Sequence, residues 1–178
     1  MTVLREPGGN SVSEQIRQLL LDSKEHIEPR CELLLFTAAR AQLVSKVIRP
    51  ALMEGHIVIC DRYIDSSVAY QGYGRGLPIK DIEHINDFAT AGLIPDITFI
   101  FDLPVDDAAK RAGFRSSDTQ TKPDRMEQSG DAFFERTKQG YLNIAHNAER
   151  NIFIINANDA MDEIFTQVQM IVQQYMKS

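Results

Sequence analysis

Short apolar runs alternate along this chain with longer segments in which apolar residues recur every three or four positions. Four runs rich in β-branched or aromatic residues predict strands, at residues 2–4, 57–60, 97–102 and 152–155. Helical periodicity marks the segments between and after them, notably residues 31–54, 79–91, 133–144 and 161–176. This alternation predicts an α/β fold, a parallel sheet with right-handed crossovers and helices on both faces.

The segment 31–54 is apolar on more than one face, which is typical of a helix buried on two sides. We expect one neighbour to be the sheet, and we predict that a second copy of the chain is the other. Phe36 and Arg40 are four residues apart and therefore share a face. An aromatic ring that stacks and a guanidinium that hydrogen-bonds an edge suit a nucleobase, although core packing is the more common role of a residue such as Phe36.

The second predicted strand ends in Asp61-Arg62, at the sheet edge where open α/β sheets bind ligands. A carboxylate can hold Mg²⁺ directly or through water, and a guanidinium can grip a phosphate with two N–H groups. A surface ion pair that begins a helix is the alternative. The following residues add hydroxyl and amide groups that could bind a small polar ligand: Ser66, Ser67, Tyr70 and Gln71.

The first predicted strand ends in a loop, residues 5–10, in which Pro7 is followed by two glycines. Such a loop lets backbone N–H groups approach a ligand closely, but it could also be a plain connection. Ser11 or Ser13 can cap the helix that follows. Arg17 lies off the apolar face of that helix, either as a solvated charge or as a phosphate ligand.

Residues 113–130 are polar and carry Arg115, Lys122 and Arg125. This composition suits a mobile lid that supplies cations to phosphates on closure, and a solvated surface loop is the alternative.

Composition narrows the classes of function. The chain has 178 residues and a formal net charge of −6, which argues against a general nucleic-acid surface. No apolar run approaches the length of a membrane span, and no signal pattern opens the sequence. Cys31 and Cys60 are far apart and have no partners at metal-ligand spacing. We therefore expect a cytoplasmic protein.

Five motifs occur in an order and spacing that resemble bacterial thymidylate kinase: Arg5-Glu-Pro-Gly-Gly9, Leu34-Leu-Phe-Thr-Ala-Ala-Arg40, Asp61-Arg-Tyr-Ile-Asp-Ser-Ser67, Tyr70-Gln-Gly72 and Asp124-Arg-Met-Glu127. Each motif is weak alone, whereas all five in order are specific, and the resemblance runs nearly end to end. It implies a P-loop kinase-like three-layer fold, with residues 1–178 as one domain. It also implies transfer of the γ-phosphoryl group of ATP to dTMP, assisted by Mg²⁺, to give dTDP.

The resemblance assigns base-binding roles by position. It implies that Phe36 stacks on thymine, that Arg40 and Gln71 hydrogen-bond its edge, and that Ser67 lies near the base. Tyr70 closes the pocket beside the deoxyribose in the same scheme.

The resemblance also assigns phosphate and metal roles. Arg17 and Arg62 hold the acceptor phosphate, and Glu6 and Asp61 sit near the metal and the phosphates. The Glu6–Pro7 peptide bond is expected to be cis. Asp61 and Arg62 are thus catalytic candidates.

The donor side departs from the family. The resemblance makes Arg115 and Arg125 catalytic lid cations and puts Arg111 beside the adenine of ATP. However, no Gly-x-x-x-x-Gly-Lys-Ser/Thr motif occurs in these 178 residues. The expected strand, P-loop and first helix are missing, and we expect the sequence to be part of a longer protein.

Two other functions stay open. One is a non-catalytic nucleotide-binding remnant, and the other is a related kinase for another nucleotide. Arg40 with Gln71 favours a base with exposed carbonyl oxygens and so disfavours cytosine.

Overall fold

The computed structural model describes the chain except residues 22–25, 109–110, 112–125, 127–128, 148 and 178. The chain divides into two compact units. The first comprises Met1–Ile94 with Lys122–Tyr141, and the second comprises Pro95–Thr121 with Leu142–Ser178.

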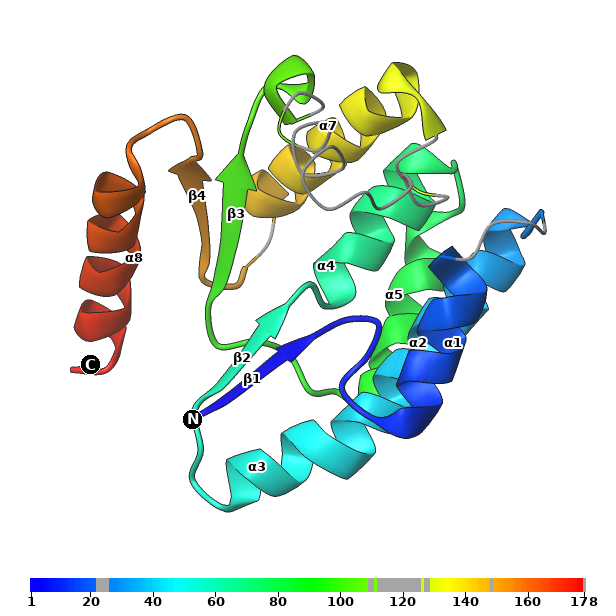
Figure 1. Cartoon of the computed structure of the whole chain (residues 1–178), viewed down its shortest axis with the longest axis horizontal. Helices are drawn as coiled ribbons and strands as arrows, with labels where there is room; N and C mark the ends of the chain where they lie inside the picture. Colours follow the sequence, from blue (N-terminus) through cyan, green and yellow to red (C-terminus); the bar gives the residue numbers. More distant parts are fainter. Residues whose placement is uncertain (22–25, 109–110, 112–125, 127–128, 148, 178) are drawn as a thin grey trace. The chain divides into compact units, whose positions relative to one another are not determined.

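The first unit is built on a parallel pair of strands, β1 (Thr2–Arg5) and β2 (Val58–Asp61) (Figure 1). Their register pairs Arg5 with Asp61, so both strands end at the same edge. Immediately beyond, the backbone N–H of Glu6 donates to the carbonyl of Asp61 at 2.9 Å. The pairing therefore brings the loop after β1 beside the end of β2, as the predicted parallel arrangement requires.

The first helix, α1 (Ser11–Leu21), packs beside α2. Its N-terminus is capped by Asn10, whose Oδ1 accepts from the backbone N–H of Ser13 at 3.0 Å. The prediction of Ser11 or Ser13 as the cap was therefore wrong. The hydroxyl of Ser13 is buried and donates to the carbonyl of Ala39 at 2.8 Å, which ties α1 to α2.

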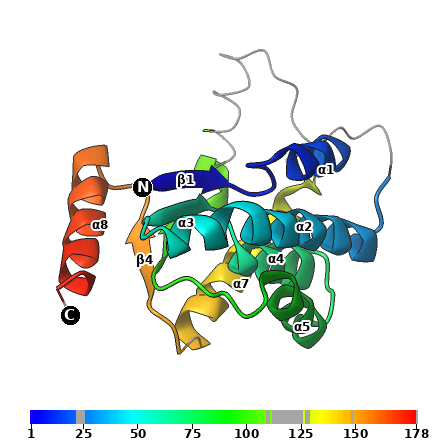
Figure 2. The ribbon, with the colours of Figure 1, turned by 90° about the horizontal axis from the view of Figure 1, so that it is seen from below.

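The predicted long helix is a continuous rod of three segments, α2 (Pro29–Leu43), the π-helical η1 (Val44–Ile48) and α3 (Arg49–Met53) (Figure 2). Pro50 has no N–H to donate within the helix, and the wider π-helical turn lies just before it. Leu43, Val44 and Ile48 are buried and form a core cluster beneath the strands.

Four more helical segments belong wholly or partly to the first unit: α4 (Ile64–Ser67), η2 (Val68–Gly74), α5 (Ile79–Thr90) and the first part of α7 (Asp131–Asn147). The amphipathic helix predicted at residues 79–91 is confirmed with one exception. Phe88 is an apolar residue of this helix but is 90% exposed. The buried face is centred on Ile82, Asn86 and Ala89, and a residue two positions from Asn86 projects from the other side.

The second unit contains the parallel pair β3 (Thr98–Asp102) and β4 (Ile152–Asn156), followed by α8 (Met161–Tyr175). Parallel pairing is confirmed throughout, but the strands form two two-stranded sheets rather than one. The resemblance places a further strand inside the sheet, and none of the described segments takes that place. Among the described helices, none combines the length and hydrophobicity needed to cross a membrane.

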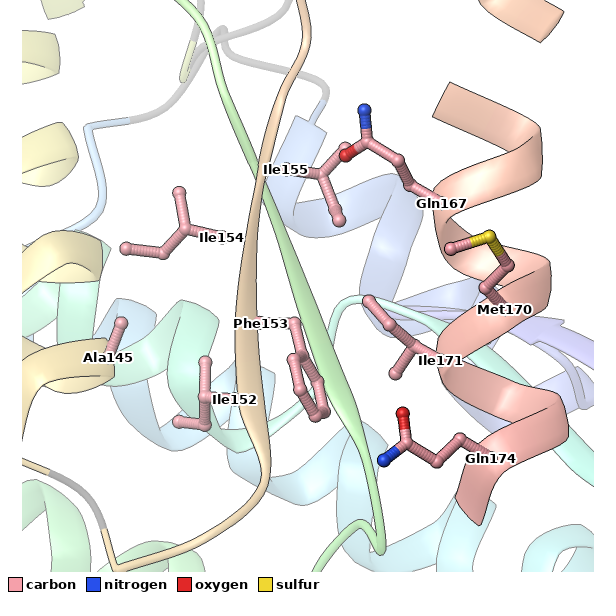
Figure 3. Close-up of a pocket in the computed structure, with 9 residues that line it drawn as sticks. All are labelled: Ala145, Ile152, Phe153, Ile154, Ile155, Gln167, Met170, Ile171 and Gln174. Carbon is pink, nitrogen blue, oxygen red and sulfur yellow. The ribbon is translucent and has the colours of Figure 1, made fainter. Parts of the chain in front are cut away.

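A cavity of about 450 Å³ lies between β4 and α8. Figure 3 shows side chains of α8, among them Met170 and Ile171, pointing toward β4. The lining is mostly apolar and includes none of the predicted site residues. The candidate site is therefore sought at the ends of β1 and β2, where several of the predicted site residues lie, and not in this cavity.

Candidate functional site

Arg40 is the most densely bonded of the predicted site residues. It is 2% exposed, and its Nε donates to Glu6 Oε2 at 2.8 Å. Its Nη1 donates to Ser67 Oγ at 2.9 Å and to Asn86 Oδ1 at 2.6 Å. Its Nη2 donates to the carbonyl of Tyr63 at 2.9 Å and lies 2.6 Å from Glu6 Oε2. A guanidinium carries five N–H groups, so these contacts engage all of them.

Glu6 is the anionic partner of Arg40, with its side chain 4% exposed. Burial raises the pKa of Glu6, and the Arg40 guanidinium opposes this shift only in part. The other carboxylate oxygen, Oε1, is buried and has no hydrogen-bond partner among the described residues. The pair therefore sits in a tightly enclosed polar pocket directly behind the ends of the strands.

Gln71 and Glu32 form a second buried polar contact. Gln71 is 2% exposed, and its Nε2 donates to Glu32 Oε1 at 2.8 Å. The carboxylate of Glu32 also faces Arg75, with Nε–Oε1 and Nη2–Oε2 distances of 3.3 Å each. Sequence reasoning missed Glu32. The available signal was an acid placed in an apolar helix one turn before Phe36, on the stripe that also carries Arg40.

Aromatic residues lie on the same side of the unit. Tyr70 makes edge contacts with Phe133 and Tyr141, at ring-centroid distances of 5.9 and 6.2 Å. The Tyr141 hydroxyl lies 2.7 Å from Ser66 Oγ, and burial raises the pKa of Tyr141 to about 12. Phe36 is half-buried on α2.

Arg62 leaves the end of β2 in an unusual backbone conformation. Its φ of 68° lies in the left-handed region, which non-glycine residues seldom adopt outside tightly constrained sites. Its guanidinium carbon is 5.1 Å from the centroid of the Tyr70 ring. The turn thus aims a cation across an aromatic face next to the exposed Asp61.

A residue of α1 holds the loop after β1 in place. The Glu6–Pro7 bond is cis, which confirms that prediction. Nη1 of Arg17 donates to the carbonyl of Pro7 at 3.0 Å. Arg17 is therefore held against the loop that carries Glu6.

Of the predicted donor-side residues, the structure describes only Arg111. Arg111 lies in the second unit, where its Nη2 donates to the carbonyl of Ala157 at 3.1 Å. Arg115, Arg125 and most of the predicted lid at 113–130 lie outside the described residues. Among the residues that are described, no three His, Cys, Asp or Glu side chains gather as a metal site.

Comparisons with known proteins identify the family of this chain. The family model for thymidylate kinase matches residues 1–168. Thymidylate kinase from Kosmotoga olearia is 44% identical over 165 residues, covering 93% of this chain and 77% of that protein. The enzyme from Thermosipho africanus is 40% identical over 175 residues, covering 98% and 84%.

A solved structure of a thymidylate kinase has a similar fold. The crystal structure of thymidylate kinase from Ehrlichia chaffeensis superposes with a TM-score of 0.75 at 31% identity, covering 96% of this chain and 80% of that one. The likeness supports the α/β, P-loop kinase-like fold predicted from the sequence. This chain belongs to the thymidylate kinase family.

Proposed function

We propose that the protein serves in the phosphorylation of dTMP to dTDP by ATP, and that these residues build the acceptor site. The observation that carries the proposal is the buried polar lining on either side of Phe36. Along α2, Arg40 lies one turn after Phe36 and donates to Ser67, and Glu32 lies one turn before Phe36 and accepts from Gln71. A half-buried ring between two fixed polar groups is suited to a planar base with polar edges.

In this proposal Phe36 stacks on thymine while Gln71 and Ser67 face its edge. Because the N–H groups of Arg40 are all engaged, its guanidinium reaches the base only if one partner is released. Ser67 is the most easily released, since a hydroxyl can rotate. Otherwise Arg40 acts through Ser67, whose own O–H stays available as a donor. Tyr70 covers the deoxyribose.

The acceptor phosphate is proposed to bind between Arg62 and Arg17, at the ends of β2 and β1. Mg²⁺, when bound, would neutralise charge on the phosphates. Asp61 fits a magnesium ligand, directly or through water, because it is exposed at the strand end. Glu6 fits less well because its carboxylate is buried against Arg40. Arg115 and Arg125 remain proposed lid cations, and Arg111 a proposed adenine neighbour.

The donor phosphates need a partner that this sequence does not contain, because the P-loop motif is absent from its 178 residues. We therefore expect this chain to bind dTMP without turning over ATP. Calorimetric titration with dTMP tests whether the chain binds dTMP. ADP production from ATP, Mg²⁺ and dTMP tests whether it turns over ATP. Turnover would refute our account of the donor site, and failure to bind dTMP would refute that of the acceptor site.

A kinase for another nucleotide is the competing function. Titration with dUMP and dCMP beside dTMP separates the two, because the proposal requires dTMP to bind more tightly than dCMP.

We also propose that the protein is a cytoplasmic homodimer that pairs through the α2–α3 rod. Large apolar side chains are exposed on the rod and on α5, which packs against α2: Leu34 at 56%, Met53 at 84% and Phe88 at 90%. Exposed groups of this kind commonly mark an interface. Light scattering at micromolar concentration should give a dimer mass that Leu34→Glu reduces to a monomer mass. A monomeric wild-type protein would contradict the proposal.

A further inference from the structure

Glu32 is a buried charged group that holds Gln71 in the site proposed above, and its own effect on the choice of base is a separate question. Its side chain is fully buried on α2. It lies one helical turn before Phe36, and Gln71 reaches it from η2. A buried carboxylate needs strong partners, and Gln71 and Arg75 supply them.

The contact fixes which end of the Gln71 amide faces the carboxylate. A carboxylate paired with a guanidinium can only accept hydrogen bonds. Nε2 of Gln71 must therefore point to Glu32, and the structure places it 2.8 Å from Glu32 Oε1. If the amide turned over, its oxygen would meet the carboxylate oxygen at the same distance, and a buried hydrogen bond would become a repulsion. The remaining polar atom, Oε1, is thus presented as an acceptor.

Glu32 is itself held in place from two further elements. Nη2 of Arg75 donates to Glu32 and also lies 3.2 Å from Ser129 Oγ. The guanidinium carbon of Arg75 is 4.4 Å from the centroid of the Phe133 ring on α7. Because Arg75 is anchored on both sides, the carboxylate cannot swing away from Gln71 without breaking these contacts.

We propose that Glu32 is a specificity-determining positioning residue, which acts by locking the Gln71 amide with its oxygen toward the base. This inference rests on the proposed function, because it requires the base edge to lie at Gln71. Thymine carries an N–H at ring position 3 and can donate to a fixed acceptor. Cytosine carries a lone pair at that position, so a locked acceptor repels it. Because the amide cannot turn over, the site distinguishes a base with an N–H group at ring position 3 from a base without one.

The deciding experiment compares dTMP and dCMP affinity in Glu32→Gln by calorimetric titration. A glutamine at position 32 can offer Gln71 either an acceptor or a donor, so the amide is free to turn. We expect dTMP affinity to fall about tenfold while dCMP affinity holds or rises, so that the ratio of the two affinities falls about tenfold or more. A role in stability alone would weaken both nucleotides equally and leave the ratio unchanged.

Two controls separate the lock from loss of charge and from loss of stability. Glu83→Gln makes the same change at an exposed position of α5 and should not alter the ratio. Arg75→Lys weakens the ion pair but keeps a cation beside Glu32 and keeps the Gln71–Glu32 contact, so it should lower stability and change the ratio far less than Glu32→Gln does. A shift in the ratio as large as that of Glu32→Gln in either control would overturn the inference.

A rescue variant keeps the test decisive if Glu32→Gln folds poorly. In Glu32→Gln/Gln71→Glu the carboxylate at position 71 presents an acceptor whichever way it turns, so the preference for dTMP should return. A folded double variant without this preference overturns the inference, as does an unchanged ratio in Glu32→Gln. A wild-type chain that binds dTMP and dCMP equally also overturns it. A wild-type chain that binds no dTMP overturns the proposed function as well.

Discussion

Removing the Arg40 guanidinium should destabilise the first unit far more than removing an ordinary arginine. Arg40→Met keeps a long side chain but leaves Glu6, with its side chain 4% exposed, as a buried carboxylate without its cation. Breaking a buried ion pair from one side costs about 3–5 kcal/mol. Since a domain's free energy of unfolding is about 5–15 kcal/mol, we expect Arg40→Met to lose a large share of it.

Urea unfolding followed by tyrosine fluorescence measures this loss. The protein has no tryptophan, and four of its five tyrosines lie in the first unit, so the signal reports mainly on that unit. Arg49→Met is the matched control, because Arg49 donates to the carbonyls of Thr90 and Ala91 at 3.2 and 2.7 Å and not to a carboxylate. We expect the control to lose about 1 kcal/mol.

The double variant Arg40→Met/Glu6→Gln tests whether the unpaired charge of Glu6 causes the loss of stability in Arg40→Met. Replacing the carboxylate by an amide should recover about 1–3 kcal/mol, because a neutral buried group is less costly than an unpaired charge. The reasoning is refuted if Arg40→Met loses no more than Arg49→Met. It is also refuted if the double variant is no more stable than Arg40→Met.

Two further changes test the packing around the site. Because burial raises the pKa of Tyr141 to about 12, this tyrosine contributes stability below its unfolded value of about 10 and loses it as the pH rises toward 12. Tyr141→Phe should lose less stability across this window, and an ultraviolet titration should show one late-titrating tyrosine fewer; an unchanged titration would contradict the shift. In Gly140→Ala the new Cβ would lie 2.8–2.9 Å from three atoms of Tyr73, so we expect about 1–3 kcal/mol of destabilisation by urea unfolding. A stability equal to wild type would mean that α7 moves away freely.

Strands and helices were predictable wherever burial shapes the local pattern. The four apolar runs became strands, and the periodic segment at 31–54 became the α2–α3 rod. Phe88 escaped prediction because an apolar residue in a helix is normally counted with the buried face. Asn10 escaped because three polar residues within positions 10–13 could each cap α1, and only the backbone path decides among them.

The identities of many candidate site residues could be predicted, but not how those side chains are bonded. Arg40 meets acceptors 23 to 46 residues away, a set that no local spacing reveals. Glu32 was passed over because an acid in a helix is usually solvated, whereas here the distant Gln71 and Arg75 make its burial tolerable. Long-range pairing of polar groups is thus the part of the site that only the folded chain discloses.

The division of the strands into two pairs has a consequence for handling the protein. Each described strand has a single strand neighbour, so both sheets leave backbone N–H and C=O groups without a strand partner along their outer sides. Ile59 on β2 and Phe101 on β3 are 50% and 55% exposed, which adds exposed apolar surface to the faces of the two sheets. Concentrated solutions should therefore form irregular aggregates by adding strands from one molecule to another, and solubility should set the upper limit of useful concentration.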